Sequence, residues 1–359
     1  MLQMQTDHKK EFFRFLAILA IGVLGAALPV LITDPFYQYH CPWFGMPVIL
    51  DNAVYQTAGA ARTLNYEDVI VGTSMTENFH TSWFDEEMGW HTIKLSYSGS
   101  RSDDLKMILS QIFTRKTPVN HIIMDINDYQ LTCPSWTAYV ERPEYLCDSK
   151  IWNDYAYIYN RDVIARGWER ALDAIEGVED NIDTAYTWED SALFGTSITL
   201  EQCRETRRIL LEEEPNAWTE EELQQMVAVC QENLDNILPF IRDNPDTEFI
   251  IYFPPYSMLY WERKKLEGNL WGTLQIYKYA IEQFLSCRNV KVHYFQNEKE
   301  IITELEYYRD EAHHRPEINR YIFECVKNGE KRVLPETLEQ EIQEMFQFAD
   351  SYDYEVYWR

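Results

Sequence analysis

Basic residues are scarce in this sequence: 32 Lys and Arg stand against 59 Asp and Glu, which gives a formal net charge of −27 over 359 residues. Because binding to phosphates needs clustered Lys and Arg, this shortage argues against nucleic acid as a partner. It also argues against broad electrostatic attraction to anionic lipid or to an anionic wall polymer. Internal repeats are missing, and a composition of 46% hydrophobic and 25% charged residues excludes a disordered or collagen-like chain.

The seven cysteines include no C-x-x-C motif, and scattered single cysteines are more often small buried side chains than metal ligands. Zinc bound by cysteine is therefore not expected. An exported location permits disulfides, but an odd number of cysteines leaves at least one thiol free. Cys133 and Cys147 flank a loop-like stretch and are the pair that local spacing favours.

Charged residues are also missing from residues 15–33, an apolar run of 19 residues. As a helix this run would be about 28 Å long, enough to span the hydrocarbon core of a membrane. Three basic residues precede the run and Asp34 follows it, so the positive-inside rule predicts a cytoplasmic N-terminus and an extracytoplasmic remainder. A cleaved signal peptide is the alternative, but residues 26–28 make a poor cleavage site. The sequence thus predicts a single-pass protein of the cell membrane.

Five short runs rich in β-branched residues are predicted as buried strands, and helical periodicity lies between most of them. This alternation implies right-handed crossovers and a parallel sheet covered on both faces, which is an α/β fold of three layers. The predicted strands are residues 68–73, 91–96, 121–126, 248–253 and 290–295. The predicted helices include residues 102–113, 162–175, 200–213, 220–242, 270–287 and 336–348.

A stretch without convincing strands interrupts the predicted α/β domain at about residues 153–239. We interpret it as a helical insertion over the mouth of the sheet, or a lid. Its acidic run at residues 212–214 is equally consistent with a solvated face. The predicted parts of the chain are a cytoplasmic N-terminus and transmembrane anchor (1–34), an extracytoplasmic linker (35–59), the α/β domain with its insertion (60–335), and a C-terminal helix with an acidic, aromatic tail (336–359).

A serine follows the first predicted strand, in the segment Gly72-Thr73-Ser74. Open parallel sheets bind ligands beyond the carboxyl ends of their strands, so Ser74 would face that crevice. The N–H groups at the start of the next helix would stabilise an oxyanion there. A single G-T-S is a weak signal, and a second copy at residues 195–197 follows no apolar strand.

Asp310 and His313 are three residues apart after the last predicted strand. On a tight turn the carboxylate can fix the tautomer of the imidazole, whose other nitrogen can then take a proton from a serine. Pro316 suits the first turn of the helix that follows. Two alternatives remain open. One is a solvated surface D-x-x-H, and the other is a metal site of Asp310, His313 and His314, which lacks a third well-spaced ligand.

Together these features resemble the SGNH (GDSL-like) hydrolase superfamily, in which a serine follows the first strand and D-x-x-H lies near the C-terminus. The resemblance implies a flavodoxin-like fold with Ser74 as nucleophile, His313 as general base and Asp310 as the partner of His313. It also implies an oxyanion hole made of the Ser74 N–H, the Gly99 N–H and the Asn127 side chain, which follow the first three strands. Two departures are visible: the first block reads G-T-S instead of G-D-S, and no glycine precedes Asn127.

The resemblance is greatest to a membrane-anchored branch, similar to the teichoic-acid D-alanylation protein DltD and to polysaccharide O-acetylation proteins. It implies an exported serine esterase or acyltransferase that acts on a cell-surface polysaccharide or wall polymer beside a membrane-bound acyltransferase partner, with no cofactor and no metal. Tyr256, after the fourth predicted strand, is expected to contact substrate or to shape its loop. The alternative is a non-catalytic surface protein that binds polymer or assembles a membrane complex. Hydrolysis and acyl transfer share one acyl-enzyme, so the sequence leaves that choice open.

Overall fold

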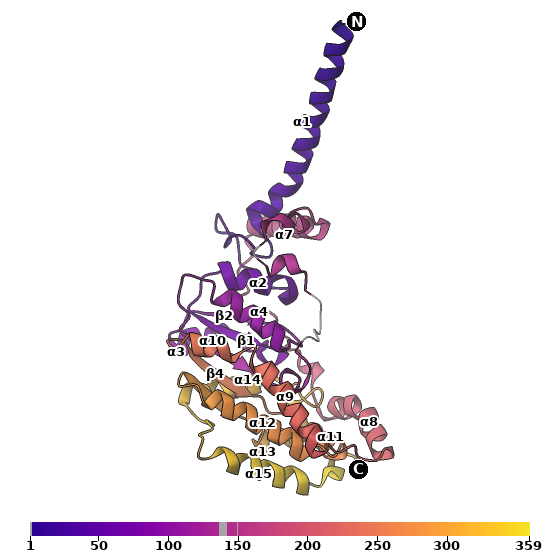
Figure 1. Cartoon of the computed structure of the whole chain (residues 1–359), viewed down its shortest axis with the longest axis vertical. Helices are drawn as coiled ribbons and strands as arrows, with labels where there is room; N and C mark the ends of the chain where they lie inside the picture. The colour runs from indigo at the N-terminus through magenta and orange to yellow at the C-terminus, as the bar shows by residue number, and fades with distance from the viewer. Residues whose placement is uncertain (1, 136–141, 149) are drawn as a thin grey trace. The chain divides into compact units, whose positions relative to one another are not determined.

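The computed structural model describes residues 2–135, 142–148 and 150–359, and the chain forms two compact units (Figure 1). The first unit consists of Met1–Asn65 and Arg142–Asn181. The second unit consists of Tyr66–Glu141 and Ile182–Arg359. Each unit therefore combines two stretches that are far apart in the sequence.

The first unit is helical in its described residues and contains the apolar N-terminal helix α1 (Leu2–Thr33). Within the described part of the chain, α1 is the one helix long and apolar enough to cross a membrane, over Lys9–Thr33. This helix fits the predicted anchor by length and composition, as it would fit a signal sequence. The other elements of the unit are α2 (Ala53–Thr63), η2 (Glu144–Leu146), η3 (Ile151–Asn153), α6 (Tyr155–Ile158) and α7 (Arg161–Glu176).

The second unit contains a five-stranded sheet in the order β2-β1-β3-β4-β5, and every pair of neighbouring strands is parallel. The predicted α/β class with five parallel strands is confirmed, and each predicted strand ends within one residue of the observed one. The strands are β1 (Asp68–Gly72), β2 (Thr92–Ser96), β3 (His121–Asp125), β4 (Glu248–Phe253) and β5 (Val290–Tyr294).

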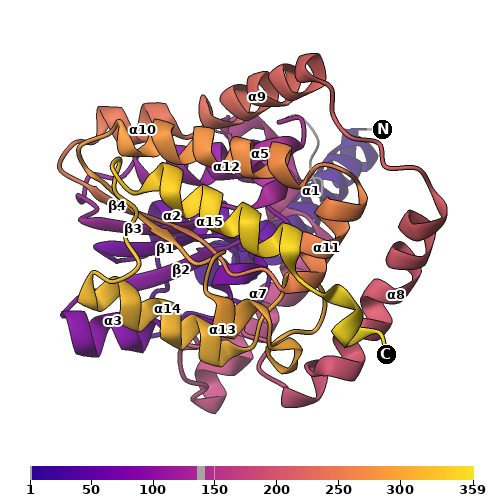
Figure 2. The ribbon, with the colours of Figure 1, turned by 90° about the horizontal axis from the view of Figure 1, so that it is seen from below.

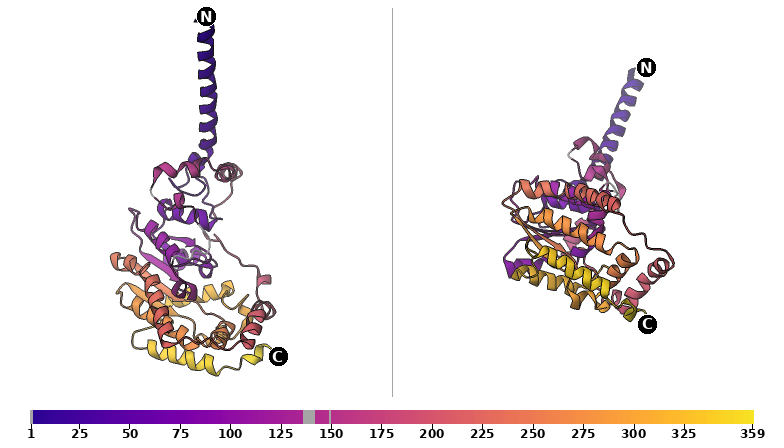
Figure 3. Two further views of the ribbon diagram at one scale, coloured as in Figure 1. Left: turned by 45° about the vertical axis from the view of Figure 1, so that its right-hand side comes forward. Right: turned by 60° about the horizontal axis from the view of Figure 1, so that its bottom comes forward.

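Helices cover both faces of this sheet. Figure 2 shows α10 and α12 on one side of the strands and α3 and α14 on the other. The C-terminal helix α15 packs on α12, as the yellow and orange helices in Figure 3 show. The helices of the second unit are α3 (Thr81–Met88), α4 (Ser102–Ile112), α5 (Asp128–Thr132), α8 (Thr196–Glu212), α9 (Glu220–Leu234), α10 (Leu238–Asp243), α11 (Met258–Leu266), α12 (Leu270–Leu285), α13 (Lys299–Ile302), α14 (Pro316–Asn328) and α15 (Leu338–Ser351). Short 3₁₀ turns are η1 (Ser74–Thr76), η4 (Ser191–Leu193), η5 (Leu305–Tyr307) and η6 (Tyr354–Tyr357).

Alternating strand residues form the core on each face of the sheet. Ile70, Ile123 and Ile250 are buried in one cluster with Phe84 of α3 and Phe323 of α14. Since both faces of a parallel sheet are covered, its strands consist of continuous apolar runs, which made them visible in the sequence. The rigid sheet leaves the loops after its strands as the places where polar side chains gather.

Two expectations about local structure are wrong. The helix predicted over residues 220–242 is two helices, α9 and α10, because Pro239 lacks an N–H and fits only near the start of a helix. Cys133 and Cys147 are both free thiols instead of a disulfide, and they belong to different units. Part of the loop between them, residues 136–141, lies outside the described residues.

The predicted insertion over residues 153–239 is free of strands, as expected. It is divided between the two units, because its part up to Asn181 belongs to the first unit and the remainder to the second. The second copy of G-T-S begins α8, where Gly195 is the N-cap.

Candidate active site

A cavity of about 520 Å³ lies at the carboxyl edge of the sheet, entirely within the second unit. The loops after β1, β2, β3 and β4 all contribute to its lining, because parallel strands present their carboxyl ends at one edge. The residues singled out in the sequence meet here: Ser74, Gly99, Asn127, Tyr256, Asp310 and His313 all line the cavity.

Ser74, His313 and Asp310 form a hydrogen-bonded chain in this cavity. The Oγ atom of Ser74 lies 2.8 Å from Nε2 of His313, and Nδ1 of His313 lies 2.7 Å from Oδ2 of Asp310. Because a carboxylate accepts, Nδ1 carries the proton and Nε2 is left to accept from the serine hydroxyl. These distances meet the geometric requirement for a nucleophile, a base and an orienting carboxylate, whereas the catalytic roles stay predictions.

The charges of the histidine and the aspartate stabilise each other. Burial alone would lower the pKa of His313, but the hydrogen bond and the negative charge of Asp310 outweigh burial and hold that pKa above its ordinary value. Burial likewise opposes ionisation of Asp310, yet the contacts with His313 hold the pKa of Asp310 below its ordinary value. Asp310 is therefore an anion and His313 a base stronger than a free imidazole.

The three-residue spacing of D-x-x-H corresponds to a tight turn, which the side chain of Asp310 closes through hydrogen bonds to the backbone. Its Oδ1 accepts from the backbone N–H of Ala312 at 2.9 Å and of His313 at 2.7 Å, while Oδ2 remains for the imidazole. One carboxylate thus fixes both the backbone and the ring of the histidine. Pro316 begins α14 directly after this turn, as predicted.

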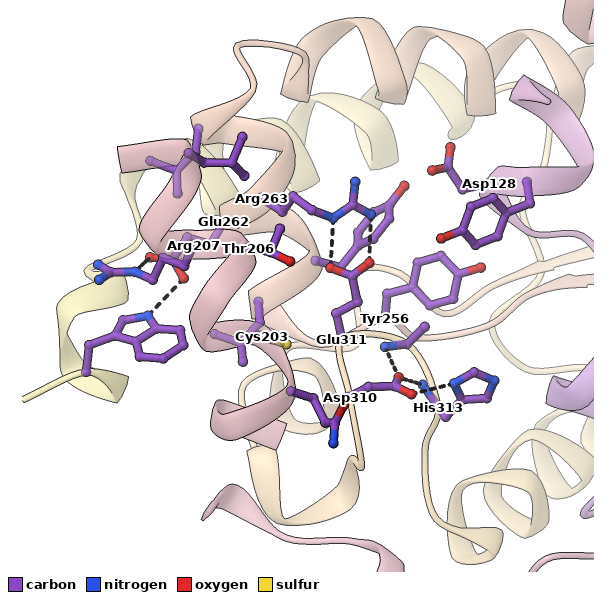
Figure 4. A pocket seen from close by; sticks show the side chains of 18 residues that line it. Asp128, Cys203, Thr206, Arg207, Tyr256, Glu262, Arg263, Asp310, Glu311 and His313 are labelled. Carbon is purple, nitrogen blue, oxygen red and sulfur yellow. Dashed lines mark hydrogen bonds and ion pairs between the residues drawn. The ribbon is translucent and has the colours of Figure 1, made fainter. Parts of the chain in front are cut away.

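Helix α11 holds the same turn from the other side through Glu311. Arg263 donates from Nε and Nη2 to the two carboxylate oxygens of Glu311, each at 2.8 Å, and Figure 4 shows the pair face to face. Ser257, at the N-cap of α11, donates its N–H and its hydroxyl to the carbonyl oxygen of Glu311. A bidentate charged pair is geometrically specific, so α11 sets the position of Asp310 and His313.

The loop that carries Ser74 is held by the buried carboxylate of Asp125. Thr73 donates its N–H to Oδ1 of Asp125 at 2.8 Å and its hydroxyl to Oδ2 at 2.6 Å. Gly72 has φ +154°, and a Cβ built on it would lie 1.8 Å from Oδ1 of Asp125. The G-T-S segment is therefore explained residue by residue: glycine leaves room for the carboxylate, and threonine binds it. Asp125 therefore has a structural role in the loop that carries Ser74.

Hydrogen-bond donors line the cavity beside Ser74. Among the described residues, no hydrogen bond is made by the backbone N–H of Ser74 or of Gly99. Asn127 uses its amide oxygen to cap α5, and its Nδ2 lies 3.5 Å from Oδ2 of Asp125. An amide nitrogen has two protons, so a second one remains for the cavity. The three groups predicted from the sequence thus lie around one hollow.

His314 and Tyr256 take positions that separate them from the hydrogen-bonded chain. His314 is buried, its Nδ1 lies 3.2 Å from the carbonyl oxygen of Arg315, and burial lowers its pKa to about 4. Within the described part of the chain, no group of three or more His, Cys, Asp or Glu side chains is arranged to hold a metal ion. Tyr256 is 4% exposed and lines this cavity and a neighbouring one, so its ring forms part of the wall between them.

The neighbouring cavity has a volume of about 440 Å³ and lies between α8, α11 and the turn of Asp310 (Figure 4). Its charged side chains are paired with each other: Arg207 donates to Glu262 at 2.7 Å, and Arg263 binds Glu311. Asp310 and His313 border both cavities. The two cavities are therefore neighbours at the turn of Asp310 and His313.

Several side chains that contribute to the site were not found in the sequence. Trp188 donates its indole N–H to Glu77 at 2.8 Å, and its ring meets the ring of His313 edge-on with centroids 5.6 Å apart. Ser98 also donates to Glu77, at 2.7 Å. Burial raises the pKa of Glu77. Trp188 comes from the predicted insertion, where no local pattern distinguishes it from other aromatic residues.

Two arginines of the first cavity are not paired with an acidic side chain of the described residues. Arg101 follows the Gly99 loop, and Arg309 precedes Asp310. In the residues that the structure describes, neither guanidinium forms an ion pair, and Nε and Nη1 of Arg101 have no hydrogen-bond partner. Each stacks on an aromatic ring, Arg101 over Tyr129 and Arg309 over Trp188. In a chain with 59 acidic residues, unpaired cations beside a serine favour an anionic ligand.

In comparisons with known proteins, no protein-family model matches this chain, and no curated protein matches it significantly.

Proposed function

We propose that the protein is a membrane-anchored, extracytoplasmic serine esterase or acyltransferase of the SGNH type, acting on a cell-surface polysaccharide or wall polymer. The observation that carries this proposal is the Ser74–His313–Asp310 chain, with a 2.8 Å contact between the hydroxyl and the imidazole. Free backbone donors beside the serine support it, because such donors stabilise the oxyanion of acyl transfer. The departure to G-T-S is compatible with the proposal, since Thr73 binds Asp125 and leaves Ser74 in the cavity.

The reaction would proceed through an acyl-enzyme. The Oγ atom of Ser74 attacks the ester carbonyl while its proton passes to Nε2 of His313, and the N–H groups of Ser74 and Gly99 with Asn127 receive the negative charge on the carbonyl oxygen. When the C–O bond of the ester breaks, His313 returns the proton to the leaving oxygen. Water or a sugar hydroxyl then attacks the acyl-enzyme, with His313 again as base, so the acceptor decides between hydrolysis and transfer.

The proposed substrate carries an anionic group near its ester. The net charge of −27 repels a long polyanion, whereas Arg101 and Arg309 offer two local cations in the cavity. A single phosphate or carboxylate held by these arginines reconciles the acidic chain with a charged polymer. Tethering by α1 would keep the enzyme beside a membrane-bound acyltransferase that supplies or uses the acyl group.

A non-catalytic binding protein is the second candidate, because the same cavity can hold a polymer without reaction. The experiment that separates the two candidates labels the full-length protein with a fluorophosphonate, which forms a covalent bond with an activated serine. We expect labelling of the wild type, its loss in Ser74→Ala and in His313→Ala, and no effect of Ser197→Ala. Ser197 is a matched control because it belongs to the second G-T-S copy and is exposed on α8.

A turnover assay with a small acetyl ester completes the test. Ser74→Ala should lower turnover by about 10³-fold or more. The melting temperature should change little, since Ser74 is only part-buried. Equal activity of the wild type and Ser74→Ala, or equal labelling of both, would exclude the esterase and leave the binding protein.

A further inference from the structure

Helix α7 exposes an apolar stripe made of Trp168, Leu172 and Ile175. These side chains are 59%, 55% and 81% exposed, respectively. Their spacing of four and three residues places them on one face of the helix. Single exposed apolar side chains are common, but a continuous row of large ones marks a surface for a membrane or for another protein. We therefore expect the stripe to be covered by a membrane or by another protein.

Two arginines of α7 are bound to acidic side chains within the first unit. Arg166 and Arg170 both bind Asp51, at 3.1 Å and 2.6 Å, and Arg170 also binds Asp173 at 2.6 Å. At 100° per residue these arginines lie on the opposite side of the helix from the stripe. The polar side of α7 thus faces its own unit, and the apolar side faces outward.

Helix α7 also packs against the last turns of α1, as Figure 1 shows. Val163 of α7 is buried in a cluster with Val30 of α1. A Cβ built on Gly167 would lie 3.1 Å from the carbonyl carbon of Pro29 and 3.2 Å from Oγ1 of Thr33. These distances are shorter than ordinary van der Waals contact, so a glycine at this position favours the close approach of the two helices, as small residues do in many contacts between membrane helices. The position of α7 along α1 is therefore fixed.

This contact sets the depth of α7 in a bilayer. The uncharged run of α1 covers residues 15–33, about 28 Å, which nearly fills the hydrocarbon core. Pro29 to Thr33 are its last turn, within about 6 Å of its outer end. A helix that touches α1 there lies at the outer boundary between hydrocarbon and headgroups.

Aromatic residues beside the end of α1 match the same boundary. His40 contacts the carbonyl oxygen of Leu31 through Nε2 at 3.0 Å, and Trp43 stacks on the His40 ring with centroids 3.7 Å apart. Trp43 is thereby held at the end of the apolar run, and it is 45% exposed. Tryptophan is enriched at membrane interfaces because its ring is apolar and its N–H is polar.

We propose that α7 is an interfacial helix whose stripe of Trp168, Leu172 and Ile175 inserts into the outer leaflet of the membrane that α1 crosses. The inference rests on the membrane anchoring within the proposed function and adds a second, in-plane attachment to it. Amphipathic helices of this kind bury their apolar face about 5–10 Å below the headgroups. A bilayer fits better than a protein partner because α7 contacts α1 at the depth of the boundary between hydrocarbon and headgroups.

Photocrosslinking in vesicles tests this proposal on the full-length protein. Leu172→p-benzoylphenylalanine places a photoreactive ketone on the stripe. The same substitution at Glu169, which is exposed on the polar flank of the helix about 90° from the centre of the stripe, is the matched control. Leu19, 52% exposed in the middle of α1, reports on the anchor itself. The protein is reconstituted in vesicles of phosphatidylcholine with phosphatidylglycerol, irradiated, and analysed for lipid adducts by mass spectrometry.

We expect lipid adducts at Leu19 and at Leu172, with several-fold fewer at Glu169. Adducts at Leu19 without adducts at Leu172 would overturn the interfacial helix and leave the anchor intact. Adducts of Leu172 with a second copy of the chain would overturn it in favour of a protein interface. Equal yields at Leu172 and Glu169 would also contradict it, because the helix would then have no preferred side. If Leu19 gives no lipid adduct, the anchor and the interfacial helix both fail.

Discussion

Replacing Gly72 by alanine tests how the serine loop is built. The backbone of Gly72 has φ +154°, which side chains rarely adopt, and the added Cβ would lie 1.8 Å from Oδ1 of Asp125 and 2.8 Å from Cγ2 of Thr76. Backbone strain costs about 1–3 kcal/mol. The carboxylate must move as well, although it accepts two hydrogen bonds from Thr73, and weakening bonds to a buried carboxylate costs about 1.5–3 kcal/mol. We therefore expect Gly72→Ala to lower the free energy of unfolding by about 3–6 kcal/mol.

A matched glycine separates the two contributions. Gly329 also has a positive φ, +69°, but a Cβ built on it meets nothing within 4 Å. Gly329→Ala should thus lower the free energy of unfolding only through backbone strain, by about 1–2 kcal/mol. The assay is denaturant unfolding of the full-length protein in detergent, followed by circular dichroism.

A double-mutant cycle locates the remaining cost at the carboxylate. If the clash with Asp125 is responsible, Gly72→Ala should cost about 1.5–3 kcal/mol less in an Asp125→Ala background than in the wild type. Equal costs for Gly72→Ala and Gly329→Ala, or no coupling between Gly72 and Asp125, would refute this reasoning. The serine loop would then tolerate side chains that the described packing does not allow.

Three further predictions concern charge. Asp310→Asn should lower turnover by about 10⁴-fold and move the acidic limb of the pH–rate profile to lower pH, because Asp310 holds the pKa of His313 above its ordinary value and catalysis needs the neutral ring. An unshifted limb would contradict that pairing. Replacing Arg309 by glutamine should lower kcat/KM for an anionic acetyl ester several-fold more than for a neutral one, and equal losses would argue against an anion site. Lys94 is buried with a pKa of about 7, so the folded chain holds this proton more weakly than the unfolded chain, in which the pKa is about 10.4. The free energy of unfolding should therefore rise by up to about 1.4 kcal/mol per pH unit between pH 7 and 10, a slope that Lys94→Met should remove.

The fold could be predicted from local patterns because each strand is buried on both faces. A continuous apolar run such as residues 248–253 then predicts a buried strand without further information. The helices between the runs predict that the strands are parallel. The break between α9 and α10 was missed because their apolar periodicity continues through it, although Pro239 marked the place. The division into two units could not be predicted, since residues 142–181 join the N-terminal helix only through tertiary packing.

The candidate site was predictable where a residue stands directly after a strand. Ser74, Gly99 and Asn127 have that signal, and Asp310 with His313 has a spacing that a single carboxylate explains. The supporting residues have no such signal. Trp188 reaches the site from a loop and Arg263 from helix α11, and only the folded chain brings them to Glu77 and Glu311. Sequence reasoning thus found the groups placed for chemistry and missed those that hold them in place.

The distance along the chain between Ser74 and His313 has a consequence for the order of assembly. Their contact joins residues 239 positions apart, and all five strands lie between the start of β1 and the turn that carries the histidine. During synthesis the serine emerges long before the imidazole. Closing so large a loop is slow relative to local folding, so Ser74 lacks its contact with His313 while the sheet is incomplete. Fluorophosphonate reactivity of Ser74 would then report completed folding, and a chain that ends before His313 would be inert even with its nucleophile loop present.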